Sequence, residues 1–201
     1  GQFHGRRPLA RARGGEEVLG RGHRHGEVAR FLRPLLDEAT EAADQLVLDV
    51  EDAVDPKAKP QALEDVIAWL EAGNKAWVRI NDYTTPFWAA DVAALKGVKN
   101  LQGVMLAKVE DASQVEATFD ALGGVTPVIA LIESALGIEE ARNIACARGT
   151  FRLAFGSGDY RRDTGTSVED IAMAYPRSRL VVASRIGNLP GPIDGPTVGT
   201  S

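Results

Sequence analysis

The stretch Gln45-Leu-Val-Leu-Asp-Val-Glu-Asp52 indicates the fold, because an apolar run of strand length ends in a cluster of acids. Four further runs have the same build and follow at intervals of roughly 25–30 residues: Ala76-Trp-Val-Arg-Ile-Asn81, Gly103-Val-Met-Leu-Ala-Lys-Val-Glu110, Pro127-Val-Ile-Ala-Leu-Ile-Glu133 and Phe151-Arg-Leu-Ala-Phe-Gly-Ser-Gly-Asp159. Runs that are apolar throughout are typical of strands buried on both faces. If these strands lie parallel, their carboxyl ends share one edge, and the charged residues converge there: Asp49, Glu51, Asp52, Arg79, Lys108, Glu133 and Asp159.

Length and composition favour a cytoplasmic enzyme. The 201 residues fit one domain or part of a larger one, and a hydrophobic content of 44% is enough for a sizeable core. No run approaches the roughly 18–20 apolar residues of a membrane span, and no apolar signal segment opens the sequence. The single cysteine, Cys146, excludes an internal disulfide framework.

The charge divides the chain into two parts. Residues 1–30 hold seven of the 23 basic residues, which leaves 16 basic and 25 acidic residues after position 30. An acidic body argues against general nucleic-acid binding, which needs a basic surface. We interpret residues 1–30 as a basic Gly/Arg-rich leader without strand patterning, disordered or not native to the protein, and residues 31–201 as the folded domain. A tail that contacts RNA or a membrane is the alternative for the leader.

The segments between the runs read as helices. Apolar spacing predicts helices over residues 27–43, 60–72 and 87–95, one opened by Asp111, and one within residues 137–147. Residues 167–186 read as a helix that Pro176 kinks or splits, although residues 180–182 are equally compatible with a strand. Residues 156–158 read as a turn and residues 192–198 as a last short strand.

This alternation of strands and helices predicts an α/β fold. Such units build either a closed barrel or an open doubly wound sheet. The barrel is favoured, because acids stand where an open sheet would carry a Gly-rich phosphate loop, and because nearly every run ends in a charge. An eight-unit barrel needs about 250 residues. With six predicted strands, we expect a TIM (βα)8-type barrel that is incomplete at its N- and C-terminal ends.

Glu133 and Asp159 are the candidate metal ligands. They close consecutive strands, and neighbouring strands lie about 4.8 Å apart, so the two carboxylates can share one ion. Oxygen ligands with positions left for water are what Mg²⁺ prefers. The alternative is that each carboxylate only caps the helix that follows it.

The other candidates concern the substrate and its protons. Arg79 interrupts an apolar strand, where its guanidinium needs a carboxylate partner from the substrate or from the protein. Three acids within four positions raise at least one pKa, which suits proton transfer, although a solvated turn explains them too. The remaining substrate-binding candidates are Lys108 and the backbone N–H groups of Gly156, Ser157 and Gly158, for which a solvated strand end and a tight turn are the alternatives.

Several of these stretches resemble the citrate lyase β-subunit branch of the HpcH/HpaI aldolase superfamily. The resemblance runs from about residue 42 to 198 and rests on Leu46-Val-Leu-Asp-Val-Glu-Asp-Ala-Val-Asp-Pro-Lys-Ala-Lys59, Val78-Arg-Ile-Asn81, Gly103-Val-Met-Leu-Ala-Lys-Val-Glu110, Val128-Ile-Ala-Leu-Ile-Glu-Ser-Ala135, Leu153-Ala-Phe-Gly-Ser-Gly-Asp159, Tyr175-Pro-Arg-Ser-Arg-Leu-Val-Val-Ala-Ser184 and Pro192-Ile-Asp-Gly-Pro196. The chain departs from the family at its opening strand, usually Leu-Phe-Val-Pro-Gly, and at three positions near the site: Ala107, Leu136 and Gly158.

The resemblance implies a TIM barrel that cleaves a carbon–carbon bond in a citryl-, malyl- or citramalyl-CoA type thioester. It implies Mg²⁺ at Glu133 and Asp159, and Arg79 on the oxoacid carboxylate. Proton transfer or contact with metal-bound water is expected of the acids at positions 49, 51 and 52. The implied partners are an oxoacid, a CoA or carrier-protein thioester and further copies of the chain in a trimer or hexamer. An aldolase acting on pyruvate-derived substrates and a non-catalytic partial-barrel subunit are the alternatives.

Overall fold

A computed structural model describes residues 10–12 and 45–195 of the chain. Its sheet has six strands, all parallel, which neighbour one another in sequence order. The strands are β1 (Ala10–Ala12), β2 (Leu46–Asp49), β3 (Ala76–Ile80), β4 (Leu101–Leu106), β5 (Val128–Ile132) and β6 (Thr150–Phe155). The helices are α2 (Lys59–Glu71), α3 (Pro86–Leu95), α4 (Ala112–Ala121), α5 (Ala135–Cys146), α6 (Ser157–Thr164) and α7 (Asp170–Ile186).

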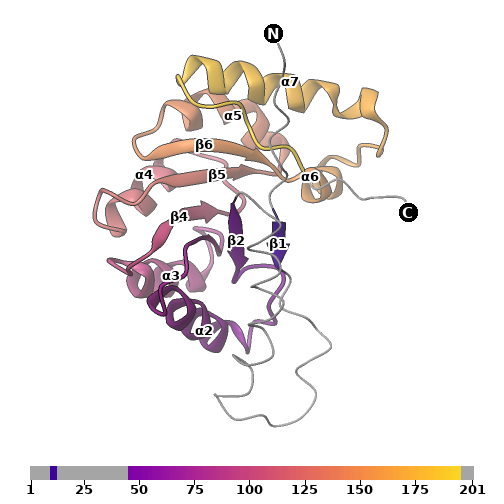
Figure 1. Ribbon diagram of the computed structural model, residues 1–201. Helices are drawn as coiled ribbons and strands as arrows, with labels where there is room; N and C mark the ends of the chain where they lie inside the picture. Colours follow the sequence, from indigo (N-terminus) through magenta and orange to yellow (C-terminus); the bar gives the residue numbers. More distant parts are fainter. Residues whose placement is uncertain (1–9, 13–44, 196–201) are drawn as a thin grey trace, which may run out of the picture.

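This order of strands is that of a barrel wall. Each strand pairs with its neighbour in sequence, and α2, α3, α4, α5 and α7 cover one side of the curved sheet (Figure 1). An isolated parallel bridge between Ala154 and Ile193 continues the wall beyond β6. An open doubly wound sheet would instead reverse its strand order at a switch point. The prediction of an α/β fold with a partial TIM-type barrel is therefore confirmed.

β2, β3 and β5 are buried at every position, and β4 and β6 are buried over their last four and last three residues, which explains the continuous apolar runs. Alternate residues such as Val78, Ile80 and Leu106 pack under the helices in a large cluster. The intervening residues form a second cluster on the other face of the sheet: Val47, Trp77, Met105, Ile129, Leu131 and Ala154, with Ile193 packed against them. Side chains alternate between the faces of a strand, so Asp49 and Arg79 lie on the side of this second cluster.

The predicted element positions hold for most of the described chain and fail at its ends. β5 has the predicted bounds, and α4 begins at the predicted cap, Asp111, whose side chain forms a capping box with Gln114. β1 was not expected, because the first thirty residues showed no strand pattern, yet residues 10–12 pair with β2. The rest of the proposed leader and the helix predicted over residues 27–43 lie outside the described residues.

Local predictions differ in their outcome. Residues 156–158 do not form a free-standing turn, because α6 begins at Ser157. The helix predicted over residues 167–186 is confirmed as α7, which includes residues 180–182; Pro176 does not split it, since the helix packs along α5 and β6 and this packing outweighs the loss of one backbone hydrogen bond. The predicted strand over residues 192–198 is reduced to the single bridge at Ile193 as far as residue 195.

Candidate functional site

A buried ion pair joins the carboxyl ends of β2 and β3. Asp49 and Arg79 are register partners on these strands. The guanidinium of Arg79 donates from Nε to Asp49 Oδ1 at 2.8 Å and from Nη2 to Oδ2 at 2.6 Å. The two residues are only 8% and 7% exposed, so each charge depends on the other for compensation. Arg79 was predicted to need a carboxylate partner, and in this structure Asp49 of the protein is that partner.

Glu51 and Lys108 extend this pair into a chain of alternating charges. Glu51 Oε2 lies 3.1 Å from Arg79 Nη1, and Glu51 Oε1 accepts from Lys108 Nζ at 3.1 Å. Lys108 Nζ also lies 3.6 Å from Asp52 Oδ1. Burial raises the pKa of Glu51 although the charge of Arg79 opposes the rise. Five of the seven residues predicted to converge are thus in one network: Asp49, Glu51, Asp52, Arg79 and Lys108.

Lys108 takes part in the site through its backbone as well as its side chain. Its φ of +52° lies in the left-handed region, which is uncommon for a residue with a side chain. In this conformation its N–H donates to Glu133 Oε1 at 2.9 Å. One residue therefore connects the network around Arg79 to Glu133, and strained backbone of this kind is often found at functional sites.

Glu133 and Asp159 lie on the same cleft at the ends of neighbouring strands. Ile132 of β5 pairs with Phe155 of β6, and Glu133 follows directly, while Asp159 stands in the first turn of α6. Burial raises the pKa of Glu133 to about 8, and the negative charge of Asp159 adds to the rise. The cleft has a volume of about 480 Å³, and its wall includes both carboxylates together with Lys108 and Arg162.

Gly156 lies between the two carboxylates in sequence and packs closely against Glu133. A Cβ at this position would lie 2.3 Å from Glu133 Oε2 and 2.5 Å from Glu133 Cβ, so a larger residue would force Glu133 to shift. Its N–H already donates to the carbonyl of Ile132 at 2.9 Å, so it is not a donor for an anion. Ser157 and Gly158 open α6, and the N–H groups of a first helical turn have no acceptor within the helix.

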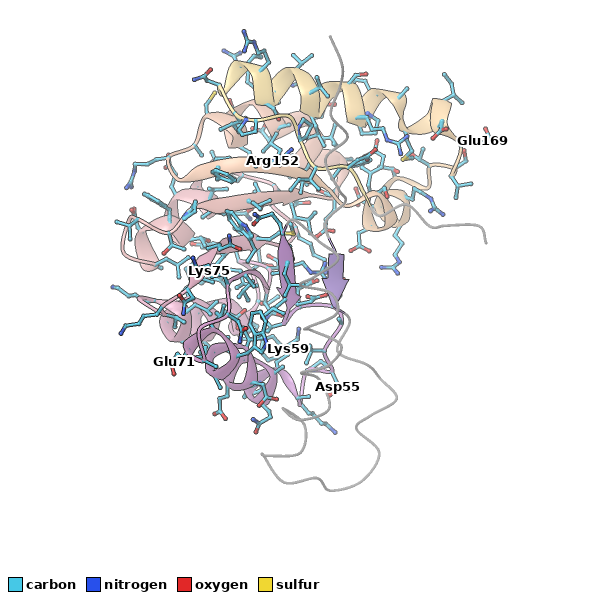
Figure 2. All side chains as sticks on the ribbon, in the orientation of Figure 1. Asp55, Lys59, Glu71, Lys75, Arg152 and Glu169 are labelled. Atoms are coloured by element: carbon cyan, nitrogen blue, oxygen red, sulfur yellow. The ribbon has the colours of Figure 1, made fainter. Side chains whose placement is uncertain are left out.

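Three further residues were not singled out from the sequence. Lys59, labelled in Figure 2 at the first residue of α2, donates from Nζ to the carbonyls of Val50 and Glu51 at 3.1 and 2.6 Å and to Asn81 Oδ1 at 2.6 Å. Asn81 in turn donates from Nδ2 to Asp91 Oδ2 at 2.7 Å. The signal in the sequence that could have pointed to this network is Asp91, an acid within the otherwise apolar helix α3. Asp91 is 3% exposed.

The donor set suits a hard divalent ion that keeps part of its shell for water and substrate. Among residues 10–12 and 45–195, no group of three or more acidic, histidine or cysteine side chains is arranged to enclose a metal. Glu133 and Asp159 form a pair, and Mg²⁺ is commonly held by one or two carboxylates plus water and substrate oxygens. Burial, and after it the negative charge of Asp159, raises the pKa of Glu133, and a bound cation would favour the ionised carboxylate against both effects.

Fold and site together define a class of protein: a parallel α/β barrel whose polar site lies at the carboxyl ends of the strands, the usual place of catalysis in such barrels. Residues 35–189 match the family model described as HpcH/HpaI aldolase/citrate lyase. The chain belongs to this family. No helix within the described ranges combines the length and apolar character that a bilayer crossing requires.

Curated relatives support the same assignment. The chain is 36% identical over 160 residues to the L-malyl-CoA/beta-methylmalyl-CoA lyase of Rhodobacter capsulatus, a match that covers 69% of this chain and 49% of that protein. It is 33% identical over 160 residues to a citrate lyase subunit beta-like protein of Mycobacterium tuberculosis, covering 76% and 56%. The chain thus spans about half the length of the curated relatives that it matches.

Solved structures show the same architecture. The M. tuberculosis citrate lyase beta subunit in complex with oxaloacetate and magnesium superposes with a TM-score of 0.69 at 31% identity, covering 83% of this chain and 74% of that one. The M. tuberculosis protein CitE in complex with magnesium, acetoacetate and coenzyme A superposes with a TM-score of 0.72 at 30% identity, covering 86% and 64%.

Proposed function

We propose that this chain forms the barrel of a Mg²⁺-dependent carbon–carbon lyase that cleaves a hydroxyacyl thioester into an oxoacid and an acyl thioester. The observation that carries the proposal is that Glu133 and Asp159 line one cleft, next to the buried network around Arg79. The names of the relatives support it, because they include a malyl-CoA lyase and a citrate lyase beta subunit bound to oxaloacetate and magnesium. The domain proposed for residues 31–201 is supported by the family match over residues 35–189.

Glu133 and Asp159 would hold the ion, which supplies a positive charge that polarises the oxygens of the bound oxoacid portion. Arg79 would bind the carboxylate of that portion. Two of its five N–H donors bind Asp49, and its Nη1 lies 3.1 Å from Glu51 Oε2, which fixes the guanidinium and leaves donors for a substrate. The exposed part of Lys108 and the start of α6 at Ser157 would contact the remaining anionic groups.

The acids at the end of β2 would handle the proton. Cleavage removes the proton of the substrate hydroxyl, breaks the adjacent carbon–carbon bond with formation of the oxoacid carbonyl, and returns a proton to the α-carbon of the thioester enolate. Glu51 is suited to this exchange, because burial raises its pKa towards the working range of a general base. Lys108 and Arg79 hold its two oxygens in place, and Asp52 flanks the same ammonium.

The test combines metal binding with turnover. Calorimetric titration of the full chain with Mg²⁺ should show binding that Glu133→Ala abolishes, and citryl-, malyl- or citramalyl-CoA should be cleaved only when Mg²⁺ is present. Cleavage of a pyruvate-derived aldol with no action on thioesters would instead identify the pyruvate-class aldolase. Absence of binding to both Mg²⁺ and oxaloacetate would favour the non-catalytic subunit and overturn the proposal.

We further propose that the protein works in the cytoplasm as a trimer or hexamer. The large apolar side chains left exposed along α7 and just before it support association between copies, since a surface of this kind is typical of an interface. They are Val168, Ile171, Tyr175, Val181, Val182 and Ile186. The single cysteine supports a reducing compartment. Light scattering coupled to size-exclusion chromatography would give the mass, and a monomer would contradict the assembly.

A further inference from the structure

Arg162 forms an ion pair with Asp159, one of the two proposed metal ligands. It stands three residues after Asp159 on α6, and its Nη1 donates to Asp159 Oδ1. The side chain of Asp159 is 22% exposed, whereas that of Arg162 is 82% exposed. The acid is therefore fixed at the cleft, and the guanidinium is the partner that can leave.

The guanidinium of Arg162 and a bound cation would compete for the same oxygen atom, Asp159 Oδ1. Asp159 Oδ1 cannot accept from Arg162 and bind an ion without bringing two positive charges together. Arg162 also lines the cleft that holds Glu133, so its charge acts on the whole proposed site and not on Asp159 alone. Binding of an ion through Oδ1 is thus favoured when Arg162 moves away.

The structure gives the side chain room for this movement. A recess of about 320 Å³ adjoins the cleft, and Arg162 lines both. The other residues of its wall are Gly158, Arg161, Gly165 and Thr166. Because Arg162 lines both spaces and its side chain is 82% exposed, a change of rotamer would move the guanidinium away from Asp159 towards the recess, and exposed side chains change rotamer within nanoseconds.

We propose that Arg162 is an internal competitor for the metal site: it neutralises Asp159 while no cation is bound and is displaced when Mg²⁺ binds. This inference rests on the proposed metal site. Its consequence is that Arg162 sets the Mg²⁺ concentration at which the site fills. The site then binds the ion more weakly than its two carboxylates alone would.

The experiment measures Mg²⁺ affinity by calorimetry on the full chain, without substrate. Arg162→Gln should bind Mg²⁺ about three- to tenfold more tightly than the wild type, the range expected for losing a partly exposed ion pair and its repulsion of the ion. Arg185→Gln removes the same charge at an exposed position in the last turn of α7, outside both spaces, and should change affinity less than about twofold. The gain of Arg162→Gln should also shrink at high salt, because salt screens exposed charges.

A second comparison separates direct competition from a general change in charge. In an Asp159→Asn background, Arg162→Gln should give a smaller gain than in the wild type, because the contact being tested is already gone and only the general charge of Arg162 is removed. Mg²⁺ binding by the wild type with no gain in Arg162→Gln, or an equal gain in Arg185→Gln, would overturn the inference and leave the proposed function standing. Absence of Mg²⁺ binding in the wild type and Arg162→Gln alike would overturn both.

Discussion

Replacing Gly156 with alanine tests the geometry of the site with a single methyl group. The added Cβ would lie 2.3 Å from Glu133 Oε2 and 2.5 Å from Glu133 Cβ, well inside contact distance. The backbone itself does not resist the change, because Gly156 has a φ of −91° that alanine adopts readily. All the cost therefore comes from displacing the buried Glu133 side chain.

The expected size follows from overpacking of a buried position. Forcing one extra carbon into a well-packed site costs about 1–3 kcal/mol of stability. For a chain of 150–250 residues, each kcal/mol lowers the melting temperature by about 2–4 °C. Gly156→Ala should therefore melt about 2–12 °C below the wild type. Displacement of a metal-binding carboxylate should also weaken Mg²⁺ binding by roughly tenfold or more.

Gly158→Ala provides the matched control two residues away. A Cβ at this position meets no atom within 4 Å, and the residue lies in the first turn of α6. Alanine should leave Mg²⁺ affinity unchanged and raise stability by up to about 1 kcal/mol. Thermal unfolding and calorimetric Mg²⁺ titration of both variants form the assay. If Gly156→Ala matched Gly158→Ala in both measurements, Glu133 would not be packed against residue 156.

Three other substitutions test the remaining parts of the site. Asp49→Ala should lower the free energy of unfolding by about 3 kcal/mol, because the buried Arg79 loses its bidentate partner. Asp120→Ala, which removes the partner of the exposed Arg148, should cost less than about 1 kcal/mol. Equal costs of the two substitutions in urea unfolding would contradict this structure. Lys59→Met removes three hydrogen bonds from one ammonium and should cost about 2 kcal/mol, so an unchanged urea midpoint would count against that network. Without metal, stability should fall as the pH rises from about 4.5 to about 8, because the folded state keeps Glu133 protonated up to a pKa of about 8 while the unfolded carboxyl titrates near 4.5. Glu133→Gln should flatten this dependence, and parallel pH curves for the two proteins would exclude Glu133 as its source.

The strands could be predicted because burial on both faces leaves a plain signal in the sequence. The run of β5, from Val128 to Ile132, is buried at every position and has the predicted bounds. β1 carries no such signal: its three residues belong to a Gly- and Arg-rich segment, and what makes them a strand is pairing with β2. A contact between residues some 35 positions apart is not visible to a local pattern.

The start of α6 was misread for a related reason. Tyr160 is its only buried residue, so the helix has no apolar period, and two glycines next to Ser157 are typical of a turn. The helix follows β6 directly, and Gly156 between them is small enough to admit Glu133. The same helix places Arg162 one turn after Asp159, and that pair could not be assigned while the stretch was taken as a turn.

The convergence of charges could be predicted from topology, but their pairing could not. Parallel strands bring their carboxyl ends together whatever the side chains are, which is why Asp49 and Arg79 meet. Which donor binds which acceptor depends on side-chain lengths and on backbone turns such as the left-handed conformation of Lys108. The network of Lys59 lay beyond sequence reasoning, because a lysine at the start of a helix is ordinarily solvated.

The formal charges around the cleft predict that Mg²⁺ and an oxoacid bind together. When ionised, the acids of the cleft wall carry five negative charges (Asp82, Glu110, Glu133, Asp159 and Asp163) against the two positive charges of Lys108 and Arg162, a formal sum of −3. A divalent ion changes this sum to −1 and lowers the repulsion that an anionic oxoacid meets in the cleft, so each ligand favours the other. By linkage, Mg²⁺ should increase oxaloacetate affinity by the same factor as oxaloacetate increases Mg²⁺ affinity. Paired calorimetric titrations measure both factors, and independent binding of the two ligands would show that the carboxylate is bound away from these charges.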